Sequence, residues 1–276
     1  MNKSTHSAVK LSNGIEMPLL GLGVWRSGPG AETEQAVRWA LDAGYRHIDT
    51  AAIYENEESV GKGVAISGVP RDEVFVTTKV WNTDQGYDST LRAMETSLNK
   101  LGLEYVDLYL VHWPVKGKFK DTWRAMEAIY ESGKARAIGV SNFLVHHLED
   151  LLGSAKVAPM VNQVEFHPRL QQPELLAFGQ KHGIAHEAWA PIMKGRVTDI
   201  PELQAIAKRH GKSPVQVTIR WELQKGVVTI PKSVHQERIV NNADVFDFAL
   251  SAEEMATIDG LDTGERVGPH PDEIDF

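Results

Sequence analysis

The feature that most constrains the fold is a regular alternation of short apolar segments with helical patterns along the chain. Eight segments are rich in Val, Ile and aromatic side chains and span residues 20–24, 45–50, 74–80, 106–112, 136–141, 160–166, 184–190 and 227–233. Their length and composition are typical of buried parallel strands. Parallel strands need crossover connections, and the intervening stretches have the apolar spacing of helices, as at Leu91, Met94 and Leu98. The alternation therefore predicts repeated βα units.

The expected helices have recognisable ends, which supports this division of the chain. Gly102 and Gly133 follow helical patterns, and Ser213 and Ser251 each begin a capping box. The interval before the last expected strand has room for two helices. Eight units in 276 residues favour a closed (β/α)8 TIM barrel over an open doubly wound sheet. Because no linker or change of composition divides the chain, we expect one domain over residues 1–276.

An N-terminal β-hairpin is expected before the barrel. Residues 9–11 and 16–20 flank the dipeptide Asn13-Gly14, whose residues both tolerate positive φ.

The composition narrows the class of protein. Hydrophobic residues make up 42% and charged residues 24%, as in globular proteins, and the net charge is −8. An acidic chain is a poor general binder of nucleic acid, so we expect no nucleic-acid partner. There is no cysteine, which excludes disulfides and thiolate sites. We see no secretory signal or membrane-spanning stretch and expect a cytoplasmic protein with no membrane partner.

Polar side chains end several expected strands, and in a barrel these ends meet at one mouth. Asp49, Lys79 and His112 end three strands, and Tyr54 follows in the loop after Asp49. A lysine beside a tyrosine lowers the pKa of the phenol, and a carboxylate keeps the lysine charged. A histidine can hydrogen-bond a substrate oxygen. This set could protonate a carbonyl oxygen while a nicotinamide delivers hydride, because no side chain donates hydride.

Two other classes of protein stay open from the residues alone. One is a metal-dependent barrel hydrolase using His47, Asp49 and His112, although no further ligand completes the set and Lys79 lies where a ligand would help. The other is a non-catalytic cofactor-binding subunit or sensor on the same scaffold. The sequence disfavours a Rossmann site, because no Gly-x-Gly-x-x-Gly follows an expected strand.

Several long segments occur in the order of one family's motifs. They are GYRHIDTAAIYENE (44–57), LGLEYVDLYLVHWP (101–114), GVSNF (139–143), VNQVE (161–165) and IPKSV (230–234). With these segments, from Val9 to the C-terminus, the chain resembles the aldo-keto reductases. The resemblance implies a single TIM barrel that reduces carbonyls with NADPH/NADP+ and without a metal, and it favours a monomer.

The resemblance also implies a role for each matching residue. Tyr54 would be the general acid, tuned by Lys79 and Asp49, and His112 would orient the carbonyl. Ser141, Asn142 and Gln163 would hold the nicotinamide carboxamide, with Trp189 stacked on the ring. Lys232, Ser233 and Arg238 would bind the 2′-phosphate, which favours NADPH over NADH. Further cofactor contacts would be Gly23, Asp49 and Asn242. The substrate pocket would be formed by Trp25, Tyr54, Trp81, His112 and Trp113.

The segment after the seventh expected strand departs from the family pattern. Ala190 stands where close relatives commonly have serine, and Lys194 adds a positive charge. The chain otherwise resembles short microbial members, among them glyoxal and methylglyoxal reductases, 2,5-diketo-gluconate reductases and a protozoan prostaglandin F synthase. This resemblance implies small aldehydes, methylglyoxal-like dicarbonyls or keto-sugars as substrates.

Overall fold

A closed barrel of parallel strands forms the centre of the molecule. The computed structural model describes residues 4–5 and 7–274. Its main sheet has eight strands in the order β10-β9-β8-β7-β6-β5-β4-β3. The strands are β3 Leu22–Gly23, β4 His47–Asp49, β5 Phe75–Val80, β6 Val106–Val111, β7 Ala135–Ser141, β8 Val161–Glu165, β9 Ala185–Trp189 and β10 Val228–Thr229. Parallel bridges between Leu20 and Thr229 and between Gly23 and Lys232 join the two edge strands. The predicted (β/α)8 barrel is confirmed.

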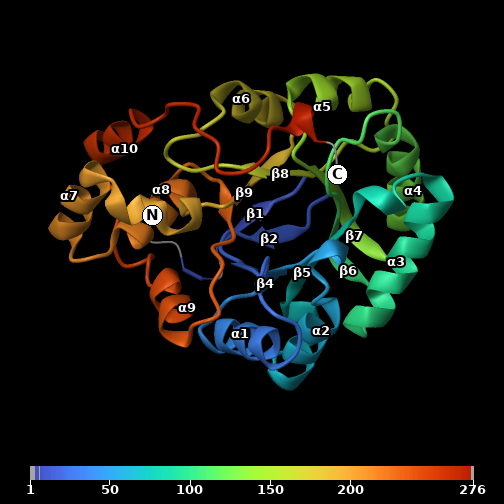
Figure 1. The fold of residues 1–276 in the computed structure, drawn as a ribbon, viewed down its shortest axis with the longest axis horizontal. Helices are drawn as coiled ribbons and strands as arrows, with labels where there is room; N and C mark the ends of the chain where they lie inside the picture. Colours follow the sequence, from blue (N-terminus) through green and yellow to red (C-terminus); the bar gives the residue numbers. More distant parts are fainter. Residues whose placement is uncertain (1–3, 6, 275–276) are drawn as a thin grey trace.

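Helices surround the barrel on its outside (Figure 1). They are α1 Ala31–Asp42, α2 Glu57–Ile66, α3 Tyr87–Leu101, α4 Phe119–Glu131, α5 Val145–Leu152, α6 Pro173–His182, α7 Pro201–His210, α8 Pro214–Gln224, α9 Gln236–Ala243 and α10 Ala252–Asp259. As expected, two helices, α7 and α8, lie between the last two strands. No helix among the described residues is long and apolar enough to cross a membrane.

Short 3-10 helices lie in the connections. They are η1 Ala52–Tyr54, η2 Arg71–Glu73, η3 Asn82–Asp84, η4 Met193–Asp199 and η5 Pro271–Glu273.

The predicted capping boxes begin α8 and α10. Ser213 Oγ accepts a hydrogen bond from the Gln216 backbone N–H at 3.2 Å, and Gln216 Oε1 accepts one from Ser213 N–H at 2.9 Å. Ser251 and Glu254 repeat the arrangement. Each cap satisfies two N–H groups that the helix itself leaves without partners, which stabilises it by about 0.5–2 kcal/mol.

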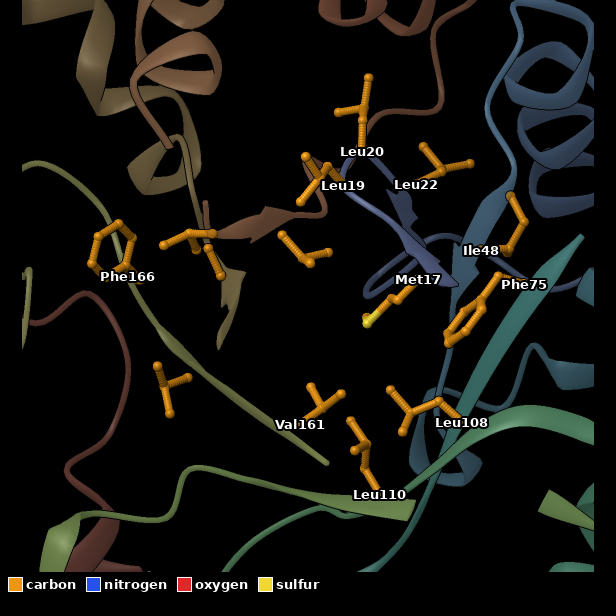
Figure 2. Packing of buried hydrophobic residues seen from close by; sticks show 14 of the residues in the cluster. Met17, Leu19, Leu20, Leu22, Ile48, Phe75, Leu108, Leu110, Val161 and Phe166 are labelled. Carbon is orange, nitrogen blue, oxygen red and sulfur yellow. The ribbon is translucent and has the colours of Figure 1, made fainter. Parts of the chain in front are cut away.

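The N-terminal hairpin closes the end of the barrel at which the parallel strands begin. Strands β1 (Ala8–Lys10) and β2 (Glu16–Pro18) pair antiparallel, and Met17 is fully buried. Figure 2 shows Met17 with Phe75, Leu108 and Val161 around it, and these three residues come from the first halves of three barrel strands. The interior is therefore packed with apolar side chains at this end, and polar groups are left for the opposite end.

Some strands are shorter than the sequence predicts, above all the two that close the barrel. A Cβ on Gly23 would lie 2.8 Å from the carbonyl oxygen of Ile230, so only glycine allows β3 and β10 to approach this closely. Strands β3 and β10 have two residues each, where five and seven were expected, and isolated bridges continue the pairing at Leu20 and Lys232.

Candidate active site

A buried ion pair joins the ends of two neighbouring strands, β4 and β5. Lys79 Nζ donates to Asp49 Oδ1 at 2.6 Å and to the Thr50 carbonyl oxygen at 2.9 Å. Asp49 pairs in register with Thr77, so Lys79 lies two residues farther along β5 and points to the same inner face. Burial acts to lower the pKa of Lys79, but Asp49 and Tyr54 outweigh it and the pKa is raised. The lysine therefore stays charged inside the barrel.

Tyr54 lies beside this pair, at the end of η1 in the loop after β4. Its ring centroid is 5.1 Å from Lys79 Nζ and 5.8 Å from the ring centroid of His112. Burial raises the pKa of Tyr54, and Lys79 acts in the opposite direction without outweighing it. Lys79 lowers the pKa of the phenol as expected, but the net shift is upward because desolvation is the larger effect. The phenol keeps its proton at neutral pH.

His112 follows β6 and faces both Tyr54 and the tryptophans. Its ring meets Trp81 edge-on at 5.1 Å and stacks near Trp113 at 6.4 Å. Asn142 Nδ2 donates to the His112 carbonyl oxygen at 2.9 Å and fixes its backbone. Burial, with Lys79 nearby, holds the pKa of His112 well below its usual range. The ring is thus a neutral imidazole, which can donate an N–H to an oxygen.

The three predicted pocket tryptophans do not all lie together. Trp81 and Trp113 contact His112, whereas Trp25 is 43% exposed. Trp25 instead contacts Arg26, whose guanidinium lies 4.4 Å from the ring centroid, and Lys194, at 5.8 Å.

A second cluster joins the ends of β7, β8 and β9. Trp189 Nε1 donates to Asn142 Oδ1 at 2.7 Å, and Asn142 Nδ2 donates to Ser141 Oγ at 3.1 Å. Ser141 Oγ in turn donates to the Gln163 carbonyl oxygen at 2.8 Å. Asn142 has φ of 65°, a conformation that asparagine tolerates better than most residues. The network holds the half-buried indole of Trp189 in one orientation.

Gln163 connects this cluster to the ion pair. Its Nε2 donates to Asp49 Oδ2 at 2.8 Å and to Glu187 Oε2 at 2.9 Å.

A third set of predicted residues surrounds the start of α9. Lys232 bridges to Gly23 at the closure of the barrel, and Ser233 Oγ accepts from His235 N–H at 3.1 Å. Ser233 and Asn242 are buried, while Arg238 is exposed on α9. No side chain caps the first turn of α9 within the described chain. Backbone N–H groups there, with two basic side chains nearby, suit an anion.

Two buried glutamates were missed by the sequence analysis. Glu187 on β9 is fully buried, and its Oε1 lies 3.6 Å from His47 Nε2. Burial and the neighbouring Asp49 raise the pKa of Glu187 to about 8. Glu165 on β8 accepts from the Gly268 N–H at 3.3 Å, which anchors the C-terminal segment over the barrel mouth. The period of two along β8 and β9 could have shown that both face inward.

The segment that departs from the family pattern holds the C-terminal segment as well. Ala190, Met193, Lys194 and Gly195 all have positive φ. Lys194 Nζ donates to the Val267 carbonyl oxygen at 2.6 Å, so its charge is directed to the C-terminal segment.

The geometry does not favour the metal-hydrolase alternative. Lys79 occupies Asp49 Oδ1, and His47 Nε2 is 3.1 Å from Thr77 Oγ1. Among the described residues, a triad with metal-ligand spacing occurs elsewhere, at His146, His147 and Asp272.

That triad is poorly prepared for a metal. Leu144 N–H donates to His147 Nδ1 at 3.2 Å, which leaves the ring proton on Nε2, the atom that faces Asp272.

Comparisons with known proteins agree with this geometry. Residues 19–263 match the model of the Aldo/keto reductase family. The glyoxal reductase of Bacillus subtilis (strain 168) is 58% identical over 276 residues, covering 100% of both chains. The 9,11-endoperoxide prostaglandin H2 reductase of Trypanosoma cruzi (strain CL Brener) is also 58% identical, covering 97% of this chain and 95% of that one. The crystal structure of a Gox0644 mutant in complex with NADPH has a TM-score of 0.94 and 44% identity, covering 98% of this chain and 99% of the other.

Proposed function

The chain belongs to the aldo/keto reductase family and is an oxidoreductase, and from that premise we propose that it reduces small aldehydes and dicarbonyls such as methylglyoxal with NADPH, using Tyr54 as the general acid. The observation that carries the proposal is the buried pair of Lys79 and Asp49 at 2.6 Å, with the Tyr54 ring 5.1 Å from Lys79 Nζ and 5.8 Å from His112. Burying an ion pair this deeply costs desolvation energy, so the pair is weak evidence for a role in protein stability. Its contact with the phenol of Tyr54 points instead to a role in the reaction.

The residues around the barrel mouth fit a nicotinamide dinucleotide phosphate. NADPH would supply the hydride. Gln163, Ser141 and Asn142 would bind its carboxamide, and the fixed indole of Trp189 would pack against the nicotinamide ring. Gly23, which has no side chain, lies against the Ile230 backbone where β3 meets β10, and it would contact the cofactor there.

The first turn of α9 fits the phosphate end of the same cofactor. Its uncapped N–H groups, with Lys232, Ser233 and Arg238, suit the 2′-phosphate. Asn242, one helix turn after Arg238, would contact the adenosine. This set favours NADPH over NADH.

Tyr54 would give its phenolic proton to the carbonyl oxygen as hydride reaches the carbonyl carbon. The C=O double bond becomes a C–O single bond, the oxygen keeps the proton, and the product is an alcohol. Charged Lys79 stabilises the phenolate left on Tyr54, and Asp49 holds Lys79 in place. His112, a neutral imidazole, donates an N–H to the same oxygen. The phenolate then takes a proton from water.

The substrate class rests on the relatives and on the aromatic walls of the mouth. Trp81 and Trp113 lie against His112, and Trp25 is 43% exposed. A prostaglandin endoperoxide is the second candidate substrate, because a relative of 58% identity is named for reducing one. A 2,5-diketo-sugar acid is the third. A non-catalytic NADPH-binding role would leave the arrangement of Tyr54, Lys79, Asp49 and His112 unexplained.

NADPH oxidation, followed by absorbance, tests the proposal against a panel of methylglyoxal, phenylglyoxal, a nitrobenzaldehyde, a 2,5-diketo-sugar acid and prostaglandin H2, with NADH in parallel. We expect turnover of aldehydes and dicarbonyls with NADPH and much weaker turnover with NADH. Binding of NADPH without turnover of any of these compounds would contradict the assigned substrate class. Failure to bind NADPH would contradict the cofactor as well.

A further inference from the structure

We propose that Glu187 is a positioning residue, which holds the Gln163 amide so that its Oε1 faces the carboxamide of the nicotinamide cofactor. The inference rests on the proposed function, since it needs a bound nicotinamide. Glu187 would touch neither substrate nor cofactor and would act through Gln163 alone.

The hydrogen bonds of Gln163 carry the inference. A primary amide has two N–H bonds, and Gln163 directs one to Asp49 Oδ2 at 2.8 Å and the other to Glu187 Oε2 at 2.9 Å. An inverted amide would place Oε1 against the ionised Asp49 carboxylate, which has no proton to donate, so Asp49 defines the orientation and Glu187 provides the second acceptor. Oε1 is then the atom left to accept a hydrogen bond from a carboxamide NH2 group.

Glu187 holds this position with few other contacts. Asp49 accepts hydrogen bonds from both Lys79 and Gln163, so its carboxyl already has a role in the ion pair. Glu187 is fully buried, its Oε1 has no hydrogen-bond partner among the described residues, and His47 Nε2 lies 3.6 Å from that oxygen. An apolar residue of equal size would cost less to bury. The hydrogen bond that Glu187 accepts from Gln163 is the contact that explains an acidic side chain at this buried position.

The charges around Glu187 fix its protonation state. The titratable groups that face it are His47 and Asp49 on β4, Lys79 on β5 and Tyr54 in the loop after β4. Two carboxyl groups share one amide, and the buried cation beside them, Lys79, binds Asp49, so the proton resides on Glu187. Burial and Asp49 raise its pKa to about 8. The protonated acid still accepts from Gln163 through its carbonyl oxygen.

Two substitutions separate the acceptor from the volume of the side chain. Glu187→Gln keeps an oxygen acceptor in the same shape, whereas Glu187→Met keeps the volume and removes the acceptor. Glu222→Met is the matched control. Glu222 is equally buried and accepts a hydrogen bond from Thr229 Oγ1 at 2.6 Å, but it lies on α8, away from Gln163.

The test measures dissociation constants by quenching of tryptophan fluorescence with three ligands. NADP+ has the carboxamide, its 3-acetylpyridine analogue lacks the amide NH2 group, and adenosine 2′,5′-bisphosphate lacks the nicotinamide. For Glu187→Met we expect NADP+ to bind about fivefold more weakly, as for the loss of one hydrogen bond. Binding of adenosine 2′,5′-bisphosphate should stay unchanged. Glu187→Gln and Glu222→Met should bind NADP+ like the unaltered protein.

The unaltered protein gives a measurement that requires no variant to fold. It should bind NADP+ more tightly than the acetylpyridine analogue, and equal affinity would overturn the inference. The inference would also be overturned if Glu187→Met bound NADP+ normally, if it lost affinity for adenosine 2′,5′-bisphosphate equally, or if Glu187→Gln lost as much. If the unaltered protein does not bind NADP+ at all, the proposed function itself fails.

Discussion

Lys79 Nζ and Asp49 Oδ1 lie 2.6 Å apart inside the barrel, where neither side chain is more than 2% exposed. This pair connects fold and chemistry. The parallel register of β4 and β5 brings the two groups to one face, and the closed barrel removes the water that would otherwise screen them. The lysine charge then acts on the neighbouring phenol.

Asp49→Asn should destabilise the protein strongly, because it leaves the buried ammonium of Lys79 without a counter-charge. We expect the free energy of unfolding to fall by about 3–5 kcal/mol. Urea denaturation measures this change. Asp42→Asn is the control, since Asp42 forms an exposed ion pair with Arg38 at 3.8 Å and should cost less than about 1 kcal/mol. Equal losses in the two variants would contradict the buried-pair interpretation.

The rate of carbonyl reduction should not decline as the pH falls through the ordinary histidine pKa of 6.5. Burial keeps the pKa of His112 well below that value, so the neutral ring persists. Burial raises the pKa of Tyr54 above 10, so the acid form also persists on the alkaline side. A kcat profile with methylglyoxal checks both limits. A loss of rate with an apparent pKa near 6.5 would contradict the assignment of a neutral His112.

Glu187→Gln should change how stability depends on pH. The pKa of Glu187 is about 8 when folded against 4.5 as the ordinary value, so between these limits the folded state binds more protons than the unfolded state. The contribution of Glu187 is therefore present below pH 4.5 and is lost as the pH rises to 8. In the variant, the free energy of unfolding should decline less between pH 5 and pH 8.

Urea denaturation at several pH values measures this slope, with the exposed Glu131→Gln as a control that should leave it unchanged. An unaltered slope in Glu187→Gln would show that the native side chain is ionised.

Arg238→Ala should weaken NADPH binding by roughly 10-fold or more, as expected when a hydrogen bond between charged groups is lost. NADH lacks the 2′-phosphate, so its affinity should hardly change. Parallel fluorescence titrations give the ratio. A similar loss for both cofactors would place the 2′-phosphate away from α9.

The barrel and the residues around its mouth could be predicted because both follow from local patterns. Apolar strands with polar ends imply a barrel with its catalytic groups at one rim. Asp49, Lys79 and His112 lie at or next to the ends of β4, β5 and β6, as predicted. The sign of the Tyr54 pKa shift could not be predicted, because desolvation depends on packing from several strands.

Contacts between distant segments were out of reach for the same reason. Lys194 was recognised as an added charge, but its partner, the Val267 carbonyl, is brought to it only by the folded C-terminal segment. Glu187 could be assigned to the inner face of its strand, but its hydrogen bond to Gln163 depends on the register of β8 and β9.

Tyr54→Phe tests the central claim most directly, because it removes the phenolic proton and keeps the ring. The measurement is kcat for NADPH-dependent reduction of methylglyoxal, together with the NADPH dissociation constant. We expect kcat to fall by roughly 10²–10⁴-fold, as for loss of a general acid, while NADPH affinity stays near that of the unaltered protein. Unimpaired turnover in this variant would contradict the assignment of Tyr54 as the proton donor.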